Sequence, residues 1–288
     1  MVSSPKSIFL RILLFPLTRI ILGIAFFIAV PTLASDWVLK PVLGRIFPDD
    51  SVEQIIRWTI SIFLLVFLYV FVFRIYERRI ITELAIRYAW KENIIGFITG
   101  GLLVGCIILV FFITGNITFT IVNPLSVIFK PLILLILLAL LEEIIFRGII
   151  YRITEQSLGT WLALIISAML FGIGHITNSH ADFLGILSVA VAGIFLGVLY
   201  TLKSRLWYPI AVHIGWNFFQ YFFGLPISGK DDFVYFMETS REGPAWYAGG
   251  AFGIENSVLT VILILGLSIF LFYRARQQDM IIKPYWKR

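Results

Sequence analysis

The sequence predicts an all-α protein that crosses a membrane about eight times, with both termini on the cytoplasmic side. Three observations lead to this prediction. Of the 288 residues, 59% are hydrophobic and 14% are charged, whereas about 25% of residues in a soluble domain are charged. The apolar residues gather in runs close to the ~20 residues that a helix needs to cross a bilayer. Basic residues lie at every second connection between these runs, as the positive-inside rule requires of cytoplasmic loops.

Eight apolar runs account for the expected helices, since only helices and closed barrels satisfy backbone hydrogen bonds within lipid. They lie at about residues 20–33, 58–73, 94–114, 125–151, 160–177, 183–201, 206–224 and 254–273. The first run could instead be the core of a cleaved signal peptide, with residues 33–35 as the cleavage site. Because Arg19 interrupts the pattern of such a peptide, we interpret the run as an uncleaved first span.

The connections divide the chain into four segments. Residues 1–57 hold an interfacial lead-in and the first transmembrane helix. Residues 58–124 hold the second and third, with a basic cytoplasmic segment at 74–92 that is expected to form an interfacial helix. Residues 125–224 form a core of four helices. Residues 225–288 hold an outer loop, interpreted as a solvated connection rather than a lid, then the last transmembrane helix and a basic cytoplasmic tail.

The charge and cysteine content limit the kinds of partner and of metal or disulfide site that the chain can have. A net charge of +6 would suggest nucleic acid in a soluble protein. Here the basic residues lie at the ends of the runs and in the tail, so membrane lipids explain them and no nucleic-acid partner is expected. The single cysteine, Cys106, excludes an intrachain disulfide and a zinc site built from thiolates. Nothing in the sequence indicates an oligomeric state.

Glu142, Glu143 and Arg147 are three ionisable groups in one apolar run. Intramembrane charges are rare and usually mark a working site. Glu143 and Arg147 lie four residues apart on one helical face and are expected to form an ion pair. Glu142 points about 100° away and has no partner in its own helix, which suits a general base. The alternative is that both glutamates lie beyond the membrane, in a charged helix end.

Two more runs contain polar side chains. His175 ends the fifth run, and His213 and Asn217 lie on one face of the seventh. At about 1.5 Å per residue, these side chains and Glu142 can share a site near the middle of the membrane that opens to the cytoplasm. Each histidine or asparagine alone could equally stabilise contacts between helices. His180, in an outer loop, is expected to be solvated.

Taken together, Glu142-Glu143-x-x-x-Arg147, Phe171-x-x-x-His175 and His213-x-x-x-Asn217 resemble the three motifs of the CPBP family of intramembrane proteases. This family includes the type II CAAX prenyl endopeptidase of eukaryotes and bacterial relatives linked to bacteriocin self-immunity. All three motifs occur in the family's order within residues 125–224, which are therefore similar to the family's catalytic core. Each motif alone is weak, whereas the ordered set is specific.

The resemblance implies an intramembrane endopeptidase that hydrolyses peptide bonds, with CAAX-type C-terminal processing as one form of this activity. Glu142 would activate water, assisted by His175. His213 and Asn217 would donate hydrogen bonds to the oxyanion that forms as the carbonyl becomes tetrahedral. The expected partners are a peptide or protein substrate and membrane lipids. The expected location is the cell (inner) membrane, or the endoplasmic reticulum membrane in a eukaryote.

The same resemblance assigns supporting roles and leaves one alternative in the chemistry. Glu143 and Arg147 would hold the turn that carries the base. No cofactor would be required. A zinc enzyme is the alternative, with Glu142, His175 and His213 as ligands, since two histidines and a carboxylate form known catalytic zinc sites. We favour direct activation of water, because the asparagine of the third motif is a poor zinc ligand and a good oxyanion donor.

Two other classes of function are weighed against a protease. The first is a non-enzymatic bacteriocin-immunity or scaffold protein that binds a peptide or partner. The second is a proton-coupled transporter that uses Glu142 and Glu143. The presence of every expected catalytic position argues against the first, and the lack of an internal sequence repeat weighs against the second. The sequence has no His-Glu-x-x-His or Gly-x-Ser-x-Gly motif of other proteases.

Overall fold

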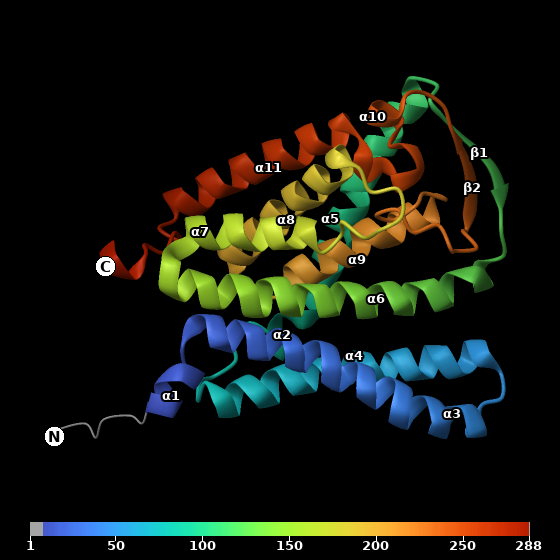
Figure 1. Ribbon diagram of the computed structural model, residues 1–288. Coiled ribbons are helices and arrows are strands. Elements are labelled where there is room, and N and C mark those ends of the chain that lie inside the picture. The colour runs from blue at the N-terminus through green and yellow to red at the C-terminus, as the bar shows by residue number, and fades with distance from the viewer. Residues whose placement is uncertain (1–7, 288) are drawn as a thin grey trace.

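The computed structural model describes residues 8–287 and shows a bundle of long helices (Figure 1). The helices are α1 Ile8–Leu13, α2 Pro16–Leu33, α3 Lys40–Ile46, α4 Asp50–Tyr76, α5 Ile86–Ile113, α6 Phe129–Glu143, α7 Arg152–Ile173, α8 Phe183–Lys203, α9 Trp207–Phe222, α10 Ala245–Ala248 and α11 Val258–Gln277. Two strands, β1 Ile117–Val122 and β2 Met237–Arg241, pair antiparallel at one end of the bundle. The opposite end carries α1 and the C-terminal end of α11.

Among residues 8–287, six helical stretches are long and apolar enough to cross a membrane, which confirms the predicted helical, multi-pass class. They are Pro16–Ile46, Asp50–Tyr76, Ile86–Ile113, Leu125–Ile173, Phe183–Lys203 and Val258–Gln277. The fourth stretch turns back at Gly159, whose φ is 81°, and so contains two predicted runs (Figure 1). With 16 residues, α9 corresponds to the seventh run. The count of eight spans and the cytoplasmic side of the termini stay predictions.

The helix that carries the first motif is not a regular α-helix. Between α6 and α7 the segment η3, Ile144–Tyr151, is π-helical. A π-turn bonds residue i to i+5 and often occurs at functional sites. It rotates the residues that follow relative to an ideal α-helix, so Gly148 comes to face α4. There the hydroxyl of Tyr69 donates a hydrogen bond of 3.0 Å to the carbonyl of Gly148.

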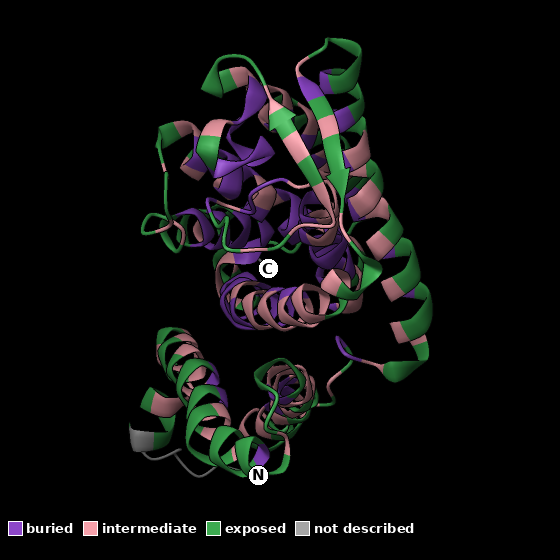
Figure 2. Cartoon of the chain, turned by 90° about the vertical axis from the view of Figure 1, so that its right-hand side faces the viewer, coloured by how far each residue is buried: buried purple, intermediate pink, exposed green. Residues whose placement is uncertain are grey.

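Burial is uneven across the bundle (Figure 2). The buried residues are concentrated in α7, α8 and α9, whereas only Phe27 and Pro31 are buried in α2. Large apolar side chains cover the outside, for example Phe63 at 70% and Ile113 at 74% exposed. Apolar surface of this extent marks contact with a membrane. The polar residues of the motifs therefore lie in the part of the bundle that is best shielded from lipid.

The close approach of α5 to α9 sets the position of the third motif. A Cβ atom added at Gly100 would overlap the backbone of Val212, and one added at Gly215 would overlap the carbonyl group of Phe97. Both positions therefore require glycine, as small-xxx-small packing of membrane helices predicts. Gly105, one turn further along α5, has open space around it.

A cluster of buried charges joins three helices at the end that carries α1. Glu77 accepts hydrogen bonds from Arg19 at 2.5 Å, Arg79 at 2.6 Å and Arg152 at 2.8 Å. Burial alone would raise the pKa of Glu77, but the hydrogen bonds and charges of Arg152 and Arg19 outweigh it and lower this pKa from 4.5 to about 2. This charge cluster links α2, α4 and α7.

The expected interfacial helix at 74–92 is wrong. The preceding span continues to Tyr76, residues 77–85 lie outside helices, and the next span begins at Ile86. The reason is that the acidic residues of this segment turn inward: Glu83 is buried and pairs with Arg79. An interfacial helix would instead have kept these charges in water.

The two connections at the other end form a small sheet that the sequence analysis did not predict. Ile117 pairs with Arg241, and Val122 pairs with Met237. Residues 117–122 are rich in β-branched side chains, which favour strands. The outer loop is therefore anchored to the start of the core, and the part of it around Ser228 reaches a cavity inside the bundle.

Candidate functional site

The ion pair predicted between Glu143 and Arg147 is present and fully buried. The two side chains lie 2.6 Å apart, and neither is exposed. Arg147 also donates a hydrogen bond of 3.1 Å to the carbonyl of Gly193 on α8, and its guanidinium lies 4.6 Å from the ring centroid of Phe171 on α7. One arginine thus holds three helices together around the second glutamate of the motif.

His213 connects α9 to both glutamates of the first motif. Its Nδ1 lies 3.0 Å from Oε1 of Glu143, and its Nε2 lies 3.7 Å from Oε2 of Glu142. An ionised carboxylate only accepts hydrogen bonds, so Nδ1 carries a proton and donates a hydrogen bond to Glu143. Nε2 is then an acceptor in the neutral ring and a donor only in the protonated ring.

Glu142 is the accessible carboxylate of the pair. Its side chain is 28% exposed, whereas that of Glu143 is 0% exposed. Within residues 8–287, the carboxylate of Glu142 forms no hydrogen bond, and the imidazole of His213 lies 3.7 Å from it. The predicted absence of a partner within its own helix therefore agrees with the structure. A carboxylate with free lone pairs next to an imidazole can accept a proton from water.

His175 lies just after the end of α7. Its Nδ1 is 2.8 Å from the carbonyl oxygen of Phe171, which makes Nδ1 the donor and leaves Nε2 as an acceptor in the neutral ring. The rings of His175 and Phe171 are 4.8 Å apart, and the ring of Phe171 lies 6.1 Å from that of His213. The phenylalanine of the second motif therefore packs against both histidines.

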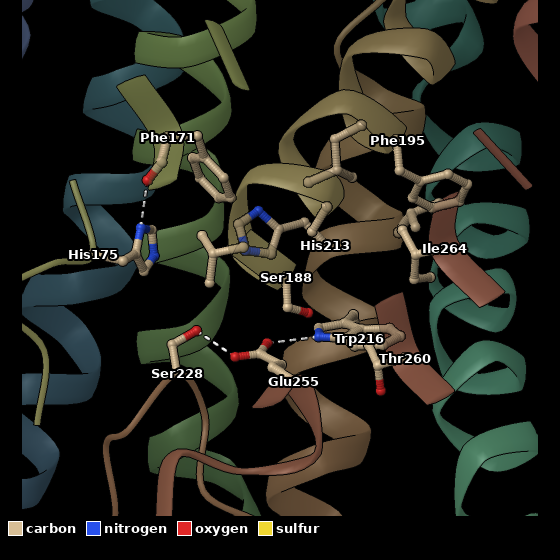
Figure 3. Close-up of a pocket in the computed structure, with 14 residues that line it drawn as sticks. Phe171, His175, Ser188, Phe195, His213, Trp216, Ser228, Glu255, Thr260 and Ile264 are labelled. Carbon is tan, nitrogen blue, oxygen red and sulfur yellow. Dashed lines mark hydrogen bonds between the residues drawn. The ribbon is translucent and has the colours of Figure 1, made fainter. Parts of the chain in front are cut away.

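Both histidines line a cavity of about 50 Å³ (Figure 3). This volume can hold a few water molecules, since each needs about 10–15 Å³ on this measure. The polar side chains Ser188, Thr260 and Glu255 also line it, so water there would find hydrogen-bond partners. Glu142 and Asn217 do not belong to the lining of the cavity.

The part of the chain that holds the motif side chains is similar to known proteins. A family model described as type II CAAX prenyl endopeptidase Rce1-like matches residues 124–219. Residues 124–219, about a third of the chain, are similar to this Rce1-like family. The match confirms the resemblance to the CPBP proteases. It spans all seven motif residues, namely Glu142, Glu143, Arg147, Phe171, His175, His213 and Asn217.

One curated protein from Bacillus subtilis (strain 168), named "Putative membrane peptidase YdiL", is 36% identical to the chain over 80 residues. The aligned residues are 28% of this chain, and they span 31% of the length of that relative. No solved structure matches the chain.

Asn217 follows His213 by one turn of α9, as the spacing of the Rce1-like motif predicts. The side chain is 8% exposed and forms no hydrogen bond with another residue in the described part of the chain. Its amide group is therefore available to a ligand. The contacts of the site join Glu142, Glu143 and His213 directly, while His175 meets His213 around the cavity.

The sequence analysis missed Glu255, which lines the same cavity as the two motif histidines. It lies before α11, is 7% exposed, and accepts hydrogen bonds from Trp216 at 2.8 Å, Gln220 at 3.1 Å and Ser228 at 2.6 Å (Figure 3). In the sequence, Glu255 is distinguished only as an acidic residue at the start of an apolar run. Its donors come from two other segments, so no local motif marks it.

Glu255 and Ser228 come from the segment between α9 and α11, at the end of the bundle where β1 and β2 lie. They supply polar groups to the cavity from that end. The expected opening of the site to the cytoplasm stays a prediction.

The structure does not bring together the ligands proposed for the alternative zinc site. Within residues 8–287, no three His, Cys, Asp or Glu side chains lie close enough together to hold one metal ion. Glu142, His175 and His213, the proposed ligands, therefore do not fit a zinc ion in this arrangement. We derive no step of the chemistry through a metal.

Proposed function

We propose that the chain is an intramembrane endopeptidase in which Glu142 activates water for hydrolysis of a peptide bond. One observation carries the proposal: Glu142 is an accessible carboxylate 3.7 Å from an imidazole that a buried carboxylate, Glu143, holds in place. Such a pair can take a proton from water and return it later in the reaction. The match of residues 124–219 to the Rce1-like family model supports the same reaction.

In the proposed first step, Glu142 removes a proton from water while the water oxygen bonds to the carbonyl carbon of the peptide. The electron pair of the C=O double bond moves to the oxygen, which becomes an oxyanion. In the second step the oxyanion collapses, the C–N bond breaks, and the leaving nitrogen takes the proton back from Glu142. The carboxylate is regenerated, and no other reactant is consumed.

The histidines and Asn217 would have distinct roles. Asn217 forms no hydrogen bond with another described residue and lies one turn after His213, so it would stabilise the oxyanion, where one donor is worth ~10²–10³ in rate. His213 can join it only as the protonated ring, because its Nδ1 proton is already used by Glu143. His175 would accept a hydrogen bond from water through Nε2 and orient it.

The proposed substrate is the C-terminal part of a membrane-associated peptide or protein, as the CAAX prenyl endopeptidase description of the family suggests. The chain is a multi-pass membrane protein. Because the curated relative is bacterial, we propose the cell membrane as its location.

Reconstitution of the full chain in liposomes with a fluorogenic peptide tests the proposal. We expect Glu142→Gln to lower hydrolysis by ~10²–10⁴, the usual contribution of a general base. His180→Asn is the control, since His180 is exposed with φ of 58°, a conformation that asparagine tolerates. Equal hydrolysis by both variants would remove the proposal. Proton flux that is lost in Glu142→Gln, without any hydrolysis, would favour the transporter instead.

A further inference from the structure

A second and larger cavity lies on the side of the bundle, between α5, α8 and α11. Its volume is about 660 Å³, within the ~300–1,000 Å³ of small-ligand sites. Its floor is apolar and comes from all three helices. The floor residues are Leu103, Phe195, Leu199, Leu202, Leu267 and Leu271. We name this cavity the lateral groove.

The rim of the lateral groove is basic. Arg87, Lys91, Lys203 and Arg205 line it at the end of the bundle that carries α1. The single acid among the lining residues, Glu92, is already paired with Arg205 at 2.6 Å. Three positive charges therefore remain without a countercharge in the lining of the groove.

The basic side chains differ in how firmly they are held. The guanidinium groups of Arg87 and Arg205 lie 4.6 Å and 4.0 Å from the ring centroid of Tyr88, so the aromatic ring positions both of them. Lys91 and Lys203 are exposed, and neither forms an ion pair with a residue in 8–287. The exposed ammonium groups of Lys91 and Lys203 thus lie on the rim of the apolar groove, together with the two arginines that the ring of Tyr88 positions.

We propose that the lateral groove binds an anionic phospholipid, with one acyl chain along the leucine-rich floor and the phosphate headgroup against Lys91, Lys203 and Arg87. The groove has the polarity of such a lipid, apolar in the interior of the bundle and cationic at one end. Basic pockets between membrane helices on the cytoplasmic side recognise anionic headgroups in this manner. A zwitterionic lipid would bring no net negative charge to the three basic side chains.

The depth of the rim agrees with this assignment. Trp90, which lies in the lining of the groove, is 70% exposed. Exposed tryptophans of membrane helices lie at the level of the lipid headgroups. The cationic rim is at the same turn of α5, because Lys91 follows Trp90 directly. The headgroup of a bilayer lipid would therefore meet the basic side chains without leaving its normal depth.

Native mass spectrometry of the delipidated full chain tests the proposal with two lipids that have the same acyl chains, phosphatidylglycerol and phosphatidylcholine. We expect tighter binding of phosphatidylglycerol. The double variant Lys91→Gln with Lys203→Gln should lose roughly fivefold in this preference for each lysine. The control removes two basic residues at the same end but outside the groove, Arg274→Gln with Lys287→Gln, and should keep the preference.

Two further arms test the apolar floor and the source of the headgroup. Thr99→Trp would fill the groove without changing its charge, and should weaken binding of phosphatidylglycerol. Glycerol 3-phosphate, which has the phosphate but no acyl chain, should not displace the lipid at equal concentration. Equal binding of both lipids by the unaltered chain, equal loss in the control, or displacement by glycerol 3-phosphate would each overturn the proposal.

Discussion

At the scale of single residues, the two adjacent glutamates have different surroundings and therefore different roles. Glu143 is 0% exposed and shared between Arg147 and His213. Glu142 is 28% exposed, and its carboxylate lies 3.7 Å from the imidazole of His213. A buried carboxylate in an ion pair is a structural anchor, because its removal leaves a buried charge without a partner. An accessible carboxylate with free lone pairs can exchange protons.

This difference predicts opposite effects of the same substitution. Glu143→Gln leaves the guanidinium of Arg147 buried without a countercharge, so we expect a loss of ~3–5 kcal/mol in the free energy of unfolding. Glu142→Gln should change stability by less than about 0.5 kcal/mol, as at other accessible sites, and should abolish hydrolysis. Thermal unfolding in detergent, with hydrolysis measured in parallel, checks both. Equal destabilisation by the two variants would show that the distinction is wrong.

Glu255 gives a second prediction at this scale. Its carboxylate accepts from Trp216, Gln220 and Ser228, three neutral donors. Glu255→Gln keeps an acceptor oxygen, and the Ser228 hydroxyl can rotate to accept from the new amide, so the expected loss of stability is about 1 kcal/mol or less. Glu255→Leu removes the acceptor of all three donors. The cost is ~1–3 kcal/mol for the buried Gln220 and less for the half-buried Trp216 and Ser228.

Thermal unfolding of the two Glu255 variants measures this difference. Ser228→Ala removes one donor and leaves the carboxylate, and serves as an intermediate case. Similar unfolding temperatures for the glutamine and leucine variants would mean that the hydrogen bonds of Glu255 do not stabilise the cavity wall.

The sequence predicted which side chains pair within one helix, and allowed Glu142 and His213 to share a site, but it did not predict the individual contacts between helices. Glu143 and Arg147 were paired from their spacing, and this ion pair is present. That His213 would lie between the two glutamates could not be read from spacing, since the contact joins α6 to α9 across 70 residues. For the same reason Glu255 had no signal, because each of its donors is distant in the chain.

At the scale of the elements, the apolar runs predicted where the helices lie, and the ends of the helices were predicted less well. Segment 74–92 was assigned to an interfacial helix from its mixed charge, but its acids face the protein interior. The strand at 117–122 was too short for its alternation to stand out beside the long apolar runs. The π-helical stretch 144–151 keeps the composition of an α-helix, so only its hydrogen bonds distinguish it.

The contact of α5 with α9 supplies the prediction at this scale. Gly100→Ala places a Cβ atom into the backbone of Val212, next to His213, and α9 must move away. We expect a loss of stability of ~1–3 kcal/mol from overpacking, with reduced hydrolysis because the third motif shifts. Gly105→Ala on the same helix meets open space and should be neutral or slightly stabilising.

Thermal unfolding and hydrolysis by both alanine variants measure the effect. The two substitutions change the helix propensity of α5 equally, so their difference reports the contact with α9 alone. Equal behaviour of the two variants would show that the close approach does not control the third motif.

At the scale of the whole molecule, two polar regions hold the bundle together at different depths. The motif residues join α6, α7, α8 and α9 in its interior, and the charge cluster around Glu77 joins α2, α4 and α7 at the end that carries α1. Helices α2 and α4, which lie outside the Rce1-like match, are therefore attached to α7 of the core by buried ion pairs as well as by apolar contacts. Stability of the whole bundle should then depend on the ionisation of Glu77.

The sign of this dependence follows from the lowered pKa. Glu77 has a pKa of about 2 in the folded chain, against 4.5 ordinarily, so its charge stabilises the folded state above pH ~4.5 and this contribution is lost as the pH falls toward 2. Glu83, whose pKa is also lowered because the hydrogen bonds and charge of Arg79 outweigh the effect of burial, acts in the same direction.

The expected loss is of order 2–3 kcal/mol for Glu77. Thermal unfolding between pH 7 and pH 3 measures it, and Glu77→Gln should flatten the profile, whereas Glu242→Gln, at an exposed acid, should not. A profile that is equally steep in the Glu77 variant would mean that other acids hold the outer helices to the core.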